Sequence, residues 1–327
     1  MNASNPRLFT SGRFAAFGNG AIVAGVLYLI LYAVYAANSR SALSVSALTD
    51  LLNNGVPLII AAAGGTLIIL LRGFDLSVAG VVSLTNVVLA AYPFQGAGGA
   101  VASLALVLAI GAAVGLVNGL LVAYVGLQSI AVTLATMIVA QGAALLVLDA
   151  PGGAVSDWIA ENMTDALAGV LPVSGLVALA VALCWLLLKR TDAGVAFYAV
   201  GKDETAAALS GVDVRRTKCT AFVLAGMLYG LAGFMLSAQT ASGNPNGGSS
   251  MLLLVFAAVA LGGTSFGGGS GGVIGSMVGA ATLTLLQKVL FSSGVESFYI
   301  GLFQGAVMVL AVLLGEAVSR MTRVVHE

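Results

Sequence analysis

The chain of 327 residues is 59% hydrophobic, has only 8% charged residues and has a formal net charge of zero. Soluble domains usually carry about 25% charged residues, so the composition predicts an integral membrane protein. The low charge excludes a nucleic-acid-binding protein, which needs a clustered basic patch.

Apolar runs predict an all-α, polytopic bundle of about ten membrane helices. Most runs approach the roughly 20 residues that cross a bilayer core. The runs at 76–92 and 251–263 are short or flanked by glycine, so we expect broken or partly re-entrant helices that other protein segments bury. The first run could instead belong to a signal peptide, but its length favours a first span. The predicted spans are 21–37, 51–71, 76–92, 100–124, 130–148, 171–188, 219–239, 251–263, 271–291 and 298–319.

The distribution of lysine and arginine predicts that both termini lie in the cytoplasm. With ten spans, this orientation places every basic residue inside except Arg40 and Lys288. The outer loop 149–170 contains four acidic residues and no lysine or arginine. The expected organisation is a cytoplasmic segment (1–20), one transmembrane domain (21–319) with a cytoplasmic loop (189–218), and a cytoplasmic tail (320–327).

The loop 189–218 is the most polar stretch, with six of the thirteen lysine and arginine residues. Asp203 is suited to cap a helix by accepting backbone N–H bonds, and Glu204 adds negative charge to the first turn. Gly211 stands where a left-handed C-terminal residue belongs. A helix of about two turns is therefore predicted at 204–210.

The small side chains of Ala206, Ala207 and Ala208 are expected to be exposed on this helix. Such a surface suits insertion into a groove of a partner protein. An ordinary loop helix that only helps to set membrane topology would explain the same pattern.

Two glycine-rich segments, 64–66 and 262–269, are candidates for phosphate-binding loops. Neither has the G-x-x-x-x-G-K-[S/T] arrangement that holds nucleotide phosphates, and the motif is absent from the whole sequence. We interpret both segments as tight turns and close helix contacts. The chain is therefore not expected to bind a cofactor or to hydrolyse ATP itself.

Metal binding and histidine chemistry are also not expected. The single histidine, His326, is the penultimate residue, and the two cysteines, Cys184 and Cys219, are far apart in the sequence. These positions do not suggest a zinc site, a disulfide framework or a catalytic histidine.

Five polar residues stand out against the apolar runs. Asp75 precedes a helix predicted from about Leu76, where it could cap the helix or serve as a gate or docking residue. The other four are Asn54, Asn118, Gln141 and Gln304. Polar side chains at such positions usually face the bundle interior, where hydrogen bonds between helices or contacts to a polar solute would both explain them.

Four segments, in order along residues 50–315, resemble the ribose-type sugar permeases of bacterial ABC importers. The run from Gly64-Gly65-Thr66 to Val78 is similar to the family's G-x-T…G-G-I-D-L-S-V, with Arg72 at the first glycine of G-G-I-D. The other matching segments are 115–122 with 130–137, 198–201 with 206–207 and 210–214, and 257–265.

The chain departs from the family pattern at three further places. Val195 replaces the arginine of T-x-x-G-R, and Lys202-Asp203 replaces Gly-Asn. The acidic Y-E-L-D-like segment corresponds to 251–254, which has no carboxylate. A heterodimer, in which a second permease supplies the missing groups, would account for the third departure.

The resemblance implies a multi-pass subunit of a bacterial inner membrane that takes a sugar or polyol from a periplasmic or extracellular sugar-binding protein. It implies a homodimer or heterodimer with a second permease, and a cytoplasmic ABC ATPase that uses ATP and Mg. An uncharged polar path suits such a solute better than an ion. The implied ATPase-coupling residues are Asp203, Glu204, Ala206, Ala207, Ser210 and Gly211.

Two other functions fit the composition less well. A secondary transporter driven by an ion gradient would need ionisable residues deep in its helices, and the predicted spans contain almost none. A membrane enzyme would need a convergent cluster of histidine, cysteine or acidic residues.

Overall fold

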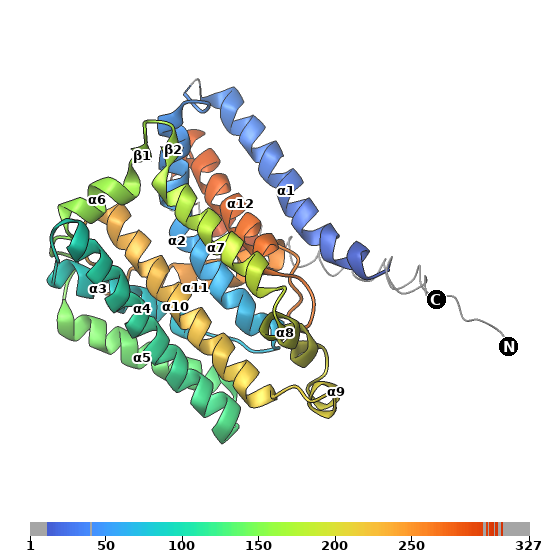
Figure 1. Ribbon diagram of the computed structural model, residues 1–327. Coiled ribbons are helices and arrows are strands. Elements are labelled where there is room, and N and C mark those ends of the chain that lie inside the picture. The colour runs from blue at the N-terminus through green and yellow to red at the C-terminus, as the bar shows by residue number, and fades with distance from the viewer. Residues whose placement is uncertain are drawn as a thin grey trace.

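The computed structural model describes residues 12–39 and 41–296, together with 299, 301–303, 305, 306 and 309. These residues form an all-α bundle with one small antiparallel hairpin (Figure 1). The helices that correspond to predicted spans are α1 (Gly12–Asn38), α2 (Val45–Leu70), α3 (Ser77–Ala91), α4 (Gly96–Leu120), α5 (Ser129–Val147), α7 (Val173–Leu188), α10 (Val214–Thr240), α11 (Met251–Leu261) and α12 (Val273–Ser292). The other elements are η1 (Leu121–Val125), α6 (Asp157–Thr164), β1 (Ala166–Leu167), β2 (Leu171–Pro172), α8 (Asp192–Lys202) and α9 (Glu204–Leu209).

The prediction of a polytopic helical membrane bundle is confirmed. Six described helices are long and apolar enough to cross a membrane, and α7 with α8 forms a further apolar pair bent by 79°. Each of the first nine predicted spans contains one helix of the structure. The tenth predicted span, 298–319, lies mostly outside the described residues.

The two weakest predicted spans are short helices in the structure. α3 has 15 residues and α11 has 11, less than a straight span requires. Most side chains of α3 are buried by neighbouring helices, as expected for helices that end inside a membrane protein.

The glycine-rich segments form tight turns and close contacts, as predicted. Gly263, Gly268, Gly269 and Gly271 all have positive φ in the turn between α11 and α12, a conformation that glycine adopts without steric cost. In α2, a side chain at Gly64 would collide with the ring of Tyr229 on α10.

α10 packs on α4 through direct backbone contact. A Cβ atom at Gly111 would collide with the Gly226 carbonyl, one at Gly115 with the Phe222 carbonyl, and one at Gly230 with that of Val107. Glycines spaced four residues apart on both helices permit this approach. α10 also packs against the largely buried α2, so these three helices form the centre of the bundle.

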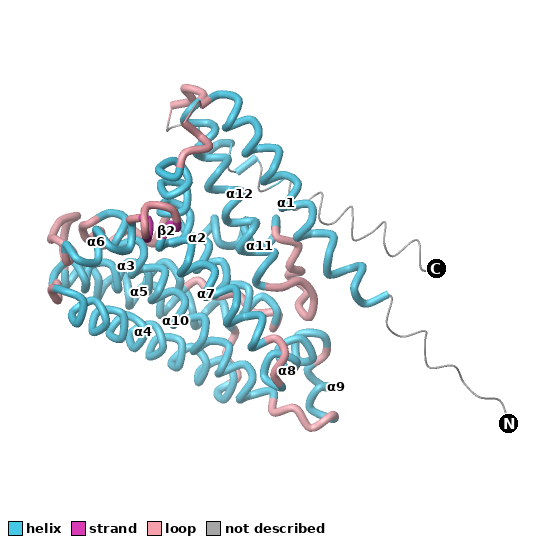
Figure 2. Tube along the Cα trace, turned by 45° about the horizontal axis from the view of Figure 1, so that its top comes forward, coloured by secondary structure: helices cyan, strands magenta, loops and turns pink. Residues whose placement is uncertain are grey.

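The bundle has two ends of different character, seen in Figures 1 and 2. We call one end the α9 face: it comprises α8, α9, the C-terminal ends of α2 and α7, and the first turn of α10. The opposite end, the α6 face, comprises α6, the β1–β2 hairpin and the C-terminal end of α10. Lysine and arginine gather at the α9 face, whereas the loop 149–170 at the α6 face is acidic.

Candidate functional site

α9 is a short helix that is capped at both ends by residues next to it in the sequence. Asp203 Oδ1 accepts hydrogen bonds from the backbone N–H groups of Thr205 (2.9 Å) and Ala206 (3.0 Å). Gly211 has φ +85°, and the N–H of Val212 donates to the Ala207 carbonyl at 3.0 Å, the hydrogen bond that closes a helix ending in a left-handed glycine. The prediction of a capped helix near 204–210 is confirmed.

The expected exposure of the alanines is correct for Ala206 and Ala208 and wrong for Ala207. Ala207 is only 4% exposed because the inner side of α9 packs on the apolar cluster that includes Phe197. The large apolar side chain presented to solvent is Leu209, which is 85% exposed. The only sequence signal for this side chain is a leucine at the end of a short helix within a polar loop.

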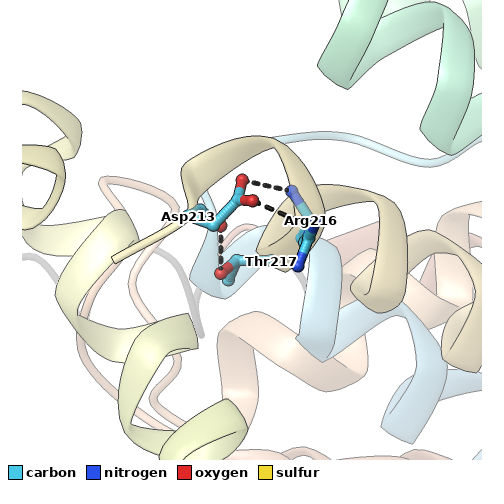
Figure 3. Close-up of polar contacts among 3 residues, drawn as sticks. All are labelled: Asp213, Arg216 and Thr217. Atoms are coloured by element: carbon cyan, nitrogen blue, oxygen red, sulfur yellow. Dashed lines mark hydrogen bonds and ion pairs between the residues drawn. The ribbon is translucent and has the colours of Figure 1, made fainter. Parts of the chain in front are cut away.

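One ion pair joins α9 to α10, and a local cap starts α10. Glu204 Oε1 lies 2.7 Å from Lys218 Nζ. Asp213 caps α10 by accepting from the Arg216 N–H at 3.0 Å, and its other oxygen pairs with the Arg216 guanidinium (Figure 3). Thr217 Oγ1 donates to the Asp213 carbonyl at 2.8 Å. The short connection after α9 therefore leads directly into α10, whose first turn is stabilised by the Asp213 cap.

Arg72 joins the end of α8 to the end of α2. Its Nε donates to the Gly201 carbonyl at 2.8 Å, and its Nη2 donates to the Lys202 carbonyl at 2.6 Å. These carbonyls belong to the last turn of α8, whose final carbonyl groups lack partners within the helix. Asp203, the cap of α9, follows directly in the sequence. In the sequence, Arg72 indicates membrane topology and lies in a segment that resembles the family pattern, and neither signal predicts this contact.

Arg72 stands where the family pattern G-G-I-D has its first glycine, and its backbone conformation is one that favours glycine. Arg72 has φ +60°, a left-handed conformation that costs a residue with a side chain about 1 kcal/mol. Next to it, the N–H of Gly269 donates to the Leu70 carbonyl at 2.9 Å, and a Cβ at Gly201 would collide with the same carbonyl. α2, α8 and the α11–α12 turn thus meet at one backbone junction.

Asp75 lies in the interior, between α2 and α3. The side chain is buried, and Oδ1 accepts from both the N–H (2.9 Å) and the hydroxyl (2.5 Å) of Ser77, the first residue of α3. Asp75 therefore binds the start of the helix, two residues before its first residue. Its Oδ2 and the Tyr229 hydroxyl are both buried without a hydrogen bond of normal geometry, although they lie close enough to interact.

The Asn118 side chain is fully buried inside the bundle. Its exposure is 0%, its Nδ2 donates to Ser77 Oγ at 3.1 Å, and its Oδ1 accepts from Thr136 Oγ1 at 2.8 Å. Both ends of the amide are thus used between helices. Of the two explanations for this residue, the arrangement favours hydrogen bonding between helices over contact with a solute.

Asn54 and Gln141 differ from Asn118 because they reach the surface. Asn54 is exposed on α2 and its Oδ1 accepts from Gln239 Nε2 of α10 at 2.8 Å. Gln141 of α5 donates to the exposed Ser249 at 3.1 Å. These contacts bring uncharged polar groups of distant segments together in the half of the bundle near the α6 face. Gln304, the fourth predicted path residue, lies outside the described residues.

No cluster of three or more histidine, cysteine, aspartate or glutamate residues suited to a metal ion occurs among the residues that the structure describes.

Comparisons with known proteins identify the family. The family described as "Branched-chain amino acid transport system / permease component" matches residues 47–312. The ribose import permease protein RbsC of Escherichia coli (strain K12) is 34% identical over 299 residues, covering 88% of this chain and 91% of RbsC. The galactose/methyl galactoside import permease protein MglC of Haemophilus influenzae is 30% identical over 305 residues, covering 88% and 91%.

A third relative, the probable ABC transporter permease protein y4mJ of Sinorhizobium fredii, is 33% identical over 316 residues, covering 95% of this chain and 92% of the relative. No solved structure matches the chain. Because the family match and these alignments cover most of the sequence, the chain belongs to this family of transport-system permease components.

Proposed function

We propose that this chain is the transmembrane permease subunit of an ATP-driven ABC importer and forms the translocation path for a sugar or sugar-like polyol. The ribose and galactose permeases named above support this assignment. Asn54, Gln141 and Gln239 give the path uncharged hydrogen-bonding groups that match sugar hydroxyls. The particular sugar is set largely by the binding protein that delivers it.

The proposed coupling role rests on the structure and the position of α9. It is a separately capped helix on one face of the bundle, paired with α10 through Lys218 and preceded directly by the end of α8, which Arg72 holds to α2. Its outer side presents Leu209 beside exposed small and polar residues, which suits insertion into a groove of the partner. The ATPase uses ATP and Mg, and its closure moves α9. The coupling residues are Asp203, Glu204, Ala206, Ala207, Ser210 and Gly211, with Leu209 added.

The proposed orientation places the α9 face in the cytoplasm of a bacterial cell. Its lysine and arginine residues, opposite an acidic α6 face, support this orientation by the positive-inside rule. The proposed chain has ten spans in the inner membrane and both termini inside. Its parts are then 1–20, the permease domain 21–319 and the tail 320–327.

The proposed partners follow from this orientation. A periplasmic or extracellular sugar-binding protein docks on the α6 face, and a second permease completes the path as a homodimer or heterodimer. The segment 251–254 lacks the carboxylate of the family pattern, which supports a heterodimer. Sugar transport by this chain reconstituted alone with its ATPase and binding protein would rule the heterodimer out.

The decisive experiment for coupling changes Leu209 to Glu. Burying a charge in an apolar groove should weaken capture of the ATPase subunit by about 30-fold or more and abolish ATP-driven uptake in proteoliposomes. The matched control is Leu167→Glu, because Leu167 is 59% exposed on the opposite face and should leave ATPase capture unchanged. Normal ATPase capture by the Leu209 variant would refute the assignment. Uptake that persists without ATP and follows an ion gradient would support a secondary transporter instead.

A further inference from the structure

A large apolar cavity separates α7 from α4 and α10 (Figure 1 shows these helices). Its volume is about 620 Å³, and its lining has no charged residue. It extends from Trp158 of α6 and Ala97 of α4, near the α6 face, to Trp185 and Leu188 of α7, near the α9 face. The cavity therefore follows the membrane-spanning direction over much of the bundle.

The lining favours an apolar occupant, because it contains no charged residue and few groups able to form hydrogen bonds. An unbranched hydrocarbon chain is narrow and needs no hydrogen-bonding partner. Exposed side chains on the cavity side of α7, such as Ala180 and Cys184, show that the space is open towards the lipid.

Basic side chains mark one end of the cavity. Lys189 and Arg190 follow Leu188 directly at the α9 face, and Arg190 is exposed. Lys189 lies 5.9 Å from the ring centre of Tyr198, which holds it close to Trp185, whose ring centre is 6.4 Å from that of Tyr198. Basic residues at the end of a crevice between transmembrane helices attract anionic lipid headgroups.

From the apolar lining of the cavity and the cations at its end, we infer that the cavity binds one anionic phospholipid. An acyl chain lies between α7 and α10, and the headgroup lies at Lys189 and Arg190. The inference requires only that the chain spans a membrane, and it is independent of the proposed coupling role of α9. The bound lipid fills the space beside the central helices.

The two tryptophans of the chain make the site directly measurable, because both line the cavity. Trp158→Phe leaves Trp185 as the single reporter, which is only 5% exposed. The purified protein is reconstituted in nanodiscs that contain phosphatidylcholine and a small fraction of phosphatidylglycerol with brominated acyl chains. Brominated phosphatidylglycerol should quench Trp185 more strongly than the same amount of brominated phosphatidylcholine.

Two variants test the location. Ala180→Phe fills the cavity and should remove most of the quenching, whereas Leu183→Phe, on the same helix but outside the lining, should preserve it. Arg190→Gln should lower the preference for phosphatidylglycerol roughly fivefold. Weak quenching by both lipids, or equal quenching of the two phenylalanine variants, would overturn the acyl-chain site. Equal quenching by the two lipids in the parent protein would overturn the role of the anionic headgroup.

Discussion

Replacing Arg72 with alanine should loosen the end of α8 and the adjoining α9 without disrupting the bundle. The change removes the hydrogen bonds to the carbonyls of Gly201 and Lys202. A hydrogen bond to a charged group is worth about 1.5–3 kcal/mol, and water competes at this exposed side chain. We therefore expect a total loss of about 1.5–3 kcal/mol, which increases local opening roughly 10- to 150-fold.

The measurement is backbone hydrogen exchange of residues 203–212 in nanodiscs, together with ATP-driven uptake in the assembled transporter. Exchange should accelerate in the Arg72→Ala protein, and less uptake should result from each ATP hydrolysed. Arg72→Gly loses the same hydrogen bonds but relieves about 1 kcal/mol of left-handed strain, so its effect should be smaller. Arg72→Lys keeps the charge but not the planar fork and should be intermediate.

Arg216→Ala is the matched control on the same face. The Arg216 side chain is 81% exposed in its ion pair with Asp213, and such pairs contribute at most about 1 kcal/mol. If Arg72→Ala exchanges no faster than the Arg216 variant, or keeps full coupling, then Arg72 does not position α9.

Three further experiments test the remaining geometry. Gly226→Leu should destabilise the protein by about 3 kcal/mol, which lowers the melting temperature in detergent. Gly142→Leu is the control and should not lower it, because the space around the Gly142 Cβ position is open. Equal melting temperatures of the two variants would contradict the backbone contact. Asn118→Ala should cost about 1–3 kcal/mol of stability and leave uptake per folded protein unchanged. Asn54→Ala should lower uptake about 2- to 10-fold at saturating binding protein, with no loss of stability. The reverse result would place Asn118 on the path. Lys218→Met removes the ion pair to α9 and should speed exchange of α9 by no more than about fivefold; a larger effect than that of Arg72→Ala would make this ion pair the principal attachment.

The sequence predicted those features that depend on neighbouring residues or on long apolar runs. Nine of the predicted spans contain a helix because an apolar segment in a membrane must satisfy its backbone hydrogen-bonding groups internally, whether or not it crosses completely. The cap at Asp203 and the left-handed Gly211 follow from the chemistry of single side chains within one helix.

The remaining features depend on which side of a helix faces which neighbour. Asn54 and Asn118 are both amides in apolar surroundings, yet one is exposed and the other is sealed by Ser77 and Thr136. Ala207 is buried between two exposed alanines because α9 lies against the bundle. Arg72 contacts carbonyls about 130 positions away, and no local pattern reports such a distance.

The direct backbone contact between α4 and α10 has a mechanical consequence. No layer of side chains lies at these glycine contacts to absorb sliding, and packed interiors do not deform continuously. If α9 moves as proposed, we therefore expect α4 and α10 to move together as one unit. Flexing is then left to the end of α4, where the π-helical turn η1 ends at the left-handed Gly126 before α5 begins. We expect bending to be easiest at this turn, because glycine permits a wider range of backbone conformations than other residues.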